Sequence, residues 1–135
     1  MNVYALLICL HVVVAISGVG QLGAIALAAR EARGAPLGAA GALERSQRVI
    51  RYALITMFLT GALLDASAGG AYHGSMWFRA SVGLLVLTGI AQARATAALR
   101  RAHTASQAFA EVERWSWAAC ALVALFTVLM EVKPG

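Results

Sequence analysis

Charged side chains are scarce in this sequence, and this scarcity bears first on the class of fold. Only 13% of the 135 residues are Asp, Glu, Lys or Arg, whereas 61% are hydrophobic. A soluble domain of this size needs a much larger charged surface, so the composition favours a protein whose solvent is lipid. Aromatic residues are also few, at 7%, and Ala, Leu, Val and Gly dominate. This mixture is typical of closely packed membrane helices.

Several kinds of catalytic and metal-binding motif are missing. No His/Cys cluster has zinc spacing, no glycine-rich phosphate loop follows a strand, and no Ser–His–acid set stands out. Gly18-Val19-Gly20 with Gly23 matches a dinucleotide fingerprint, but it lies inside an apolar run without a preceding strand. Cys9 and Cys120 each lie inside an apolar run. We expect both to be small buried apolar residues rather than a disulfide or metal pair.

Long apolar runs, by contrast, are present. A hydrocarbon core about 30 Å thick needs roughly 20 apolar residues in a helix. Four runs satisfy this length. The first is expected to be a membrane helix and not a signal peptide, because no basic residue precedes it and it is longer than a signal peptide's apolar region. The sequence therefore predicts an all-α integral membrane four-helix bundle, a single domain over residues 1–135, with helices at about 3–29, 49–68, 76–98 and 115–132.

The distribution of basic residues predicts the orientation in the membrane. Nine arginines lie in or beside the first and third connections: Arg30, Arg33, Arg45, Arg48, Arg51, Arg94, Arg100, Arg101 and Arg114. Only Arg79 and Lys133 belong to the opposite side. The positive-inside rule places the arginine-rich connections in the cytoplasm, so both termini face outward. Because these arginines flank apolar runs and form no single patch, membrane topology explains the net charge of +5 better than nucleic acid does.

Two other patterns predict how the helices pack. Residues 99–114 resemble a polar helical extension with an apolar face at Ala102, Phe109 and Val112. Gly20, Ala24 and Ala28 are spaced by four, a stripe of small residues that lets another helix approach closely. Packing within one chain is the preferred interpretation of the stripe, and a homodimer contact is the alternative.

His11 is the main candidate for chemistry, because ionisable groups within a membrane helix are costly and usually functional. It lies about eight residues, or roughly 12 Å, into the first helix. One interpretation is a hydrogen bond to a neighbouring helix, through Thr56, Thr60 or a carbonyl; the other is a metal or haem ligand. Ala15 and Gly18 lie on the same helical face and leave room for a flat macrocycle.

Other polar groups are expected on the same side of the membrane. Asp65 and Arg79 lie near the outer ends of their helices, where they can pair; alternatively, Arg79 meets a haem propionate. His73, in the Gly-rich loop, is the candidate for a second axial ligand, and Met76 is the alternative to it. In a two-fold dimer each subunit would instead contribute one His.

Parts of the first and third helices resemble a group of small bacterial membrane proteins. Leu10-His11-Val12-Val13 with Gly18 and Gly20, and Trp77-Phe78-Arg79 with the run 82–87, are similar to segments of the HemJ-type protoporphyrinogen oxidases and the CopD-like domains. The resemblance covers under half of the chain. The resemblance implies a bacterial cytoplasmic (inner) membrane location and haem ligation by His11. It also implies that Arg79 occupies the position of the family's functional basic residue. The family's basic residue is typically Lys, and its later His is missing here, so haem binding fits better than the specific enzyme activity.

These observations lead to a haem b-binding, cytochrome-like membrane protein as the expected function. Its role would be electron transfer, porphyrin oxidation or haem sensing, with an electron partner that the sequence does not identify. The first alternative is a cofactor-free accessory or structural subunit. The second is a transporter for a small solute or a metal, although no paired carboxylates or Met/Cys ladder marks a path.

Overall fold

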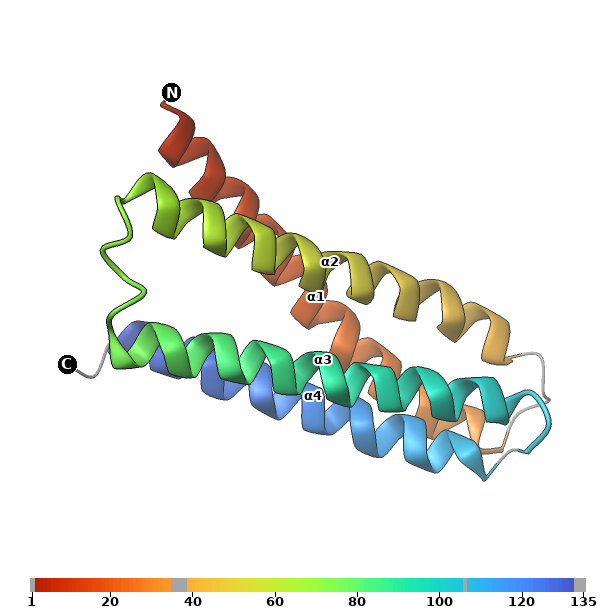
Figure 1. Ribbon diagram of the computed structural model, residues 1–135. Coiled ribbons are helices and arrows are strands. Elements are labelled where there is room, and N and C mark those ends of the chain that lie inside the picture. Colours follow the sequence, from red (N-terminus) through yellow and green to blue (C-terminus); the bar gives the residue numbers. More distant parts are fainter. Residues whose placement is uncertain (1, 35–38, 106, 133–135) are drawn as a thin grey trace.

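The computed structural model describes residues 2–34, 39–105 and 107–132, and these form four antiparallel helices (Figure 1). They are α1 (Val3–Ala32), α2 (Ala39–Ser67), α3 (Met76–Ala102) and α4 (Ala108–Val132). Helix α1 packs on α2 and α4, and α3 packs on α4 and α2, so the bundle is a closed ring of neighbours. Each helix is long and apolar enough to cross a membrane.

All four helices extend beyond the predicted bounds at one end of the bundle. The largest differences are at α2, which begins at Ala39 instead of 49, and α4, which begins at Ala108 instead of 115. The prediction was wrong there because it counted only continuous apolar residues, whereas these extensions are amphipathic. The expected apolar face is confirmed, since Ala102, Phe109 and Val112 are fully buried. Residues 35–38, in the first connection, lie outside the described residues.

Local signals fix the ends of two helices. The Asn2 side chain accepts a hydrogen bond from the backbone N–H of Ala5 at 2.9 Å and caps α1. Helix α2 ends where Gly69 and Gly70 adopt φ angles of 67° and 74°, a conformation that glycine adopts without strain. The connection 68–75 then returns to the end of α2, where the backbone N–H of Tyr72 donates to Asp65.

The buried core lies at the end of the bundle that carries the arginines, here called the arginine end. Its largest fully buried side chains are Phe109, Leu22, Ile25, Ile50, Leu99 and Val112. Polar contacts surround this core: Arg33 pairs with Glu113, and Arg101 with Glu111 at 2.7 Å. His103 contacts Glu44 at 2.9 Å. This end therefore has the apolar interior and charged exterior of a protein in water.

The opposite end, here called the loop end, contains Asn2, the connection 68–75 and the last turn of α4. Here the pair α1/α2 diverges from the pair α3/α4, and α2 and α3 are joined by the longest described connection (Figure 1). Large apolar side chains of α1 are exposed at this end, including Val3, Leu6, Val13 and Ile16. Such a surface is stable where lipid, not water, surrounds it.

Two packing predictions need correction. Cys9 is exposed on α1, not buried, while Cys120 is partly buried against the core. In the stripe of small residues, Gly20 and Ala24 are exposed, and a Cβ atom built on Gly20 meets nothing within 4 Å. Only Ala28 packs against the core. Gly20 therefore does not serve packing within the chain, whereas Ala24 borders a groove that Ala42 and Leu43 of α2 also line.

Candidate functional site

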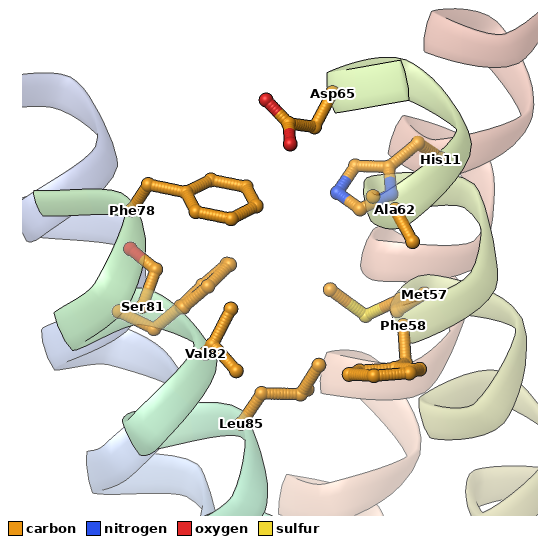
Figure 2. Close-up of a pocket in the computed structure, with 11 residues that line it drawn as sticks. His11, Met57, Phe58, Ala62, Asp65, Phe78, Ser81, Val82 and Leu85 are labelled. Carbon is orange, nitrogen blue, oxygen red and sulfur yellow. The ribbon is translucent and has the colours of Figure 1, made fainter. Parts of the chain in front are cut away.

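A cavity of about 280 Å³ lies between the two helix pairs toward the loop end. Figure 2 shows its two walls: Met57, Phe58, Ala62 and Asp65 of α2 stand with His11 on one side, and Phe78, Ser81, Val82 and Leu85 of α3 on the other. Phe126 of α4 also lines it. The lining is mainly apolar with a few polar groups, the composition of small-molecule sites, whose volumes run from about 300 to 1,000 Å³.

His11 is held in this cavity by α2. Its Nδ1 lies 2.7 Å from Oγ1 of Thr60, and that oxygen lies 2.8 Å from the carbonyl oxygen of Thr56. A hydroxyl has one proton, and two oxygens so close together need it between them. The Thr60 hydroxyl therefore donates to Thr56, and Nδ1–H of His11 donates to Thr60. This assigns the proton to Nδ1 and leaves the lone pair on Nε2.

The second ring nitrogen of His11 has no hydrogen-bond partner among residues 2–34, 39–105 and 107–132. A His that binds a metal typically donates its other N–H to a protein acceptor, which fixes the tautomer and the ring orientation. The contact with Thr60 has this form. The same contact also fits the interpretation of His11 as a hydrogen-bonded packing residue. That interpretation, however, leaves Nε2 without a partner.

Gly61 supplies the space beside the imidazole. A Cβ atom built on Gly61 would lie 3.8 Å from Cε1 of His11, in ordinary van der Waals contact. Gly18 has another role: a Cβ there would lie 3.2 Å from Cβ of Ala53, so Gly18 permits the close crossing of α1 and α2. Gly18 borders a separate apolar void of about 20 Å³, and neither Gly18 nor Ala15 lines the main cavity.

Of the remaining predicted site residues, Asp65 lines the cavity, whereas His73 and Arg79 lie outside it. Asp65 accepts a hydrogen bond from the backbone N–H of Tyr72 at 2.9 Å, and its other oxygen lies 3.7 Å from Nδ1 of His73. Asp65 thus holds the connection 68–75 and is not paired with Arg79. The side chain of His73 is 72% exposed. Arg79 is exposed in the first turn of α3, beside the lining residue Phe78.

Several lining residues were not anticipated from the sequence. Met57, Phe58, Gly61, Phe78, Ser81 and Phe126 lie in ordinary apolar runs, and no local pattern distinguishes them from lipid-facing or packing positions. Met76 is 71% exposed and does not line the cavity. Among the described residues, no group of three or more His, Cys, Asp or Glu side chains could hold a metal ion. Any metal here would depend on His11 together with ligands of its own, as in a porphyrin.

In the described part of the chain, the fold and the site define a class: an all-helical bundle with four helices able to span a membrane and a histidine-containing apolar cavity. Comparisons with models of protein families, with curated proteins and with solved structures found no match for this chain. The resemblance to the HemJ-type and CopD-like families stays a prediction.

Proposed function

We propose that the chain is a multi-pass protein of the bacterial cytoplasmic membrane that binds haem b through His11. In this proposal the loop end and both termini face outward, and the arginine end reaches the cytoplasm. The observation that carries the haem proposal is the state of His11: Nδ1–H is anchored on Thr60 and Nε2 is left free beside the cavity. A neutral imidazole with one free lone pair is the form that binds haem iron.

The surroundings of His11 fit a haem in chemistry and fit it less well in size. Phe58, Phe78 and Phe126 provide apolar aromatic surface for a macrocycle. A porphyrin is larger than a cavity of about 280 Å³, so one edge would extend out between α2 and α3. These two helices share the smallest contact of any neighbouring pair, which makes that extension the easiest one. The macrocycle edge would then contact lipid.

The polar residues at the loop end have distinct roles in this proposal. Arg79 is exposed one residue after Phe78, and its guanidinium would meet a haem propionate there. The Asp65 carboxylate lines the cavity and would repel that propionate, so the propionates would lie away from it. His73 would have to leave Asp65 before it could become a second axial ligand. His11 is thus the axial ligand that this chain supplies most directly.

The protein's own contribution would be binding, orientation and exclusion of water. His11 would hold the iron, Thr60 would fix the ring and raise its basicity, and the apolar walls would lower the local dielectric. The haem itself would supply one-electron chemistry. This supports an electron-transfer, porphyrin-oxidising or haem-sensing role.

Absorption spectroscopy tests the proposal. Detergent-purified protein from haem-replete cells would be compared with His11→Ala, and with His73→Ala as a matched control at an exposed histidine. We expect a Soret band that sharpens with α and β bands on reduction, lost in His11→Ala and retained in His73→Ala. Loss in both variants would make His73 a ligand as well. Colourless wild-type protein would refute the haem proposal.

The cofactor-free accessory subunit is the second candidate, and the His11–Thr60 hydrogen bond is the observation in its favour. It predicts colourless protein in which His11→Gln costs little stability. Transport has weaker support. Below the main cavity the next void holds only about 20 Å³ and is lined by apolar side chains and Thr88, so these two cavities do not outline a polar path.

A further inference from the structure

We propose that a groove between α2 and α3 at the arginine end binds the headgroup of an anionic phospholipid. The groove holds about 510 Å³ and is distinct from the His11 cavity. The proposed lipid binding rests on the proposed membrane insertion, because a lipid reaches the groove only from a bilayer. It does not depend on haem.

The groove carries positive charge without a balancing negative one. Arg51 of α2 and Arg100 of α3 line it, and both are exposed. No acidic side chain lines it among the described residues. Basic pockets between membrane helices on the cytoplasmic side are suited to anionic lipid headgroups.

Two buried amide groups line the same groove as the two arginines. Gln47 and Gln92 are only 3% and 6% exposed, and Nε2 of each, together with Oε1 of Gln92, has no hydrogen-bond partner in the described parts of the chain. The hydroxyl of Thr96 donates to the carbonyl oxygen of Gln92 at 2.9 Å, so its 3.4 Å approach to Oε1 of Gln47 is weak. Unpartnered buried amides are rare and costly. A phosphate, which only accepts hydrogen bonds, would pair with such N–H groups and with the guanidinium groups.

The spacing along each helix puts these groups in one line. Gln47 and Arg51 are four residues apart on α2, and Gln92, Thr96 and Arg100 are spaced by four on α3, so each set occupies one helical face. The α3 set extends over about 12 Å. This length accommodates a phosphate together with the glycerol portion of a lipid.

The groove becomes apolar at its other end, where Leu54, Ile55 and Gly89 line it. A Cβ atom built on Gly89 meets nothing within 4 Å, so an acyl chain has room there. A polar section that continues into an apolar one matches an amphiphile and not a free ion. The occupant is therefore a phospholipid rather than inorganic phosphate.

Native mass spectrometry of the full-length protein in detergent tests this inference, with phosphatidylglycerol, phosphatidylcholine and inorganic phosphate as separate probes. The test variant is R51Q/R100Q. The control is R48Q/R94Q, which removes the same charge from exposed arginines outside the groove. Each basic group near an anionic lipid contributes about fivefold in affinity, so we expect R51Q/R100Q to bind phosphatidylglycerol about thirtyfold more weakly. The control should stay within about twofold of wild type.

A second variant probes the apolar end. Gly89→Leu adds a side chain where the structure is open, and it should reduce phosphatidylglycerol binding while both arginines remain. Equal losses in the two arginine variants, equal binding of phosphatidylcholine, or unchanged binding by Gly89→Leu would each overturn the site. Full competition by inorganic phosphate would show that the groove binds a free anion and not a lipid. Protein that stays soluble without detergent would instead refute membrane insertion, and absorption spectra decide the haem proposal separately.

Discussion

At the scale of single residues, the pair His11–Thr60 decides most of the chemistry. An intramembrane histidine needs partners for two ring nitrogens, and the described structure provides one, 2.7 Å away. Which nitrogen is protonated follows from the adjacent contact between Thr60 and Thr56. One hydroxyl on a neighbouring helix thus selects the tautomer that leaves a lone pair at the cavity.

Replacing Thr60 therefore has a defined spectroscopic result. In a His73→Gln/His103→Gln background, ¹⁵N NMR of haem-free protein should show His11 with its proton on Nδ1. Thr60→Val should remove this preference, whereas Thr60→Ser keeps the hydroxyl and should preserve it. We also expect Thr60→Val to lower the free energy of unfolding by about 0.6 kcal/mol, a typical value for interhelical hydrogen bonds in membranes. A wild-type proton on Nε2 would contradict the assigned tautomer, and an unchanged spectrum in Thr60→Val would show that Thr60 does not select it.

The candidate site was predictable from the sequence only in part. His11 stood out because an imidazole in an apolar helix is expensive, and Thr60 was one of three named partners. The facing wall of Phe78, Ser81 and Val82 could not be predicted, because it depends on how α3 is rotated and how far it diverges from α2. The Asp65 contacts depend on the path of residues 68–75, and sequence spacing does not specify that path.

At the scale of helices, the crossing of α1 over α2 depends on one glycine. Gly18 faces Ala53 so closely that a Cβ atom would lie 3.2 Å from that methyl group, whereas Gly20, two residues later, faces open space. The same residue type thus has two roles within one turn. Gly18 sets the distance between helices, and Gly20 only lowers helix propensity.

This contrast gives a matched pair of substitutions. Gly18→Ala should push α1 from α2 and destabilise the protein by about 1 kcal/mol or more. Gly20→Ala should be neutral or stabilise by up to about 1 kcal/mol. Thermal unfolding in detergent would measure both. Combining Gly18→Ala with Ala53→Gly should recover part of the loss, and the crossing contact is refuted if the two glycine variants behave alike.

The helices themselves were predictable, and their full length was not. Apolar runs of roughly 20 residues identify the part of each helix that lipid can surround. In the extensions of α2, α3 and α4 at the arginine end, apolar residues recur with helical spacing among polar ones. The stability of these extensions comes from packing around Phe109 and Leu99. That packing is a property of the assembled bundle, so the apolar content of one segment does not reveal it.

At the scale of the whole molecule, the two ends of the bundle are packed differently. The arginine end buries apolar side chains beneath charged ones, as in water, and the loop end exposes them. Together with the positive-inside rule, this supports a bundle whose arginine end extends from the membrane into the cytoplasm.

Labelling of single cysteines tests that orientation. Starting from a Cys9→Ala/Cys120→Ala protein, Gly74→Cys places a thiol in the connection 68–75, and Thr104→Cys places one between α3 and α4. A membrane-impermeant maleimide added to intact bacteria should label Gly74→Cys and leave Thr104→Cys unlabelled until the cells are broken. The reverse pattern would invert the topology, and labelling of both in intact cells would argue against insertion.

The divergence of α2 from α3 at the loop end affects how the binding of any ligand should be measured. The cavity beside His11 lies where these helices share little contact, at the level of apolar side chains that lipid would cover. A hydrophobic molecule would then enter sideways from the bilayer after partitioning into it. Its occupancy would follow its mole fraction in the membrane rather than its aqueous concentration. Dilution of the bilayer with inert lipid should therefore weaken apparent binding even when the total amount of ligand is constant.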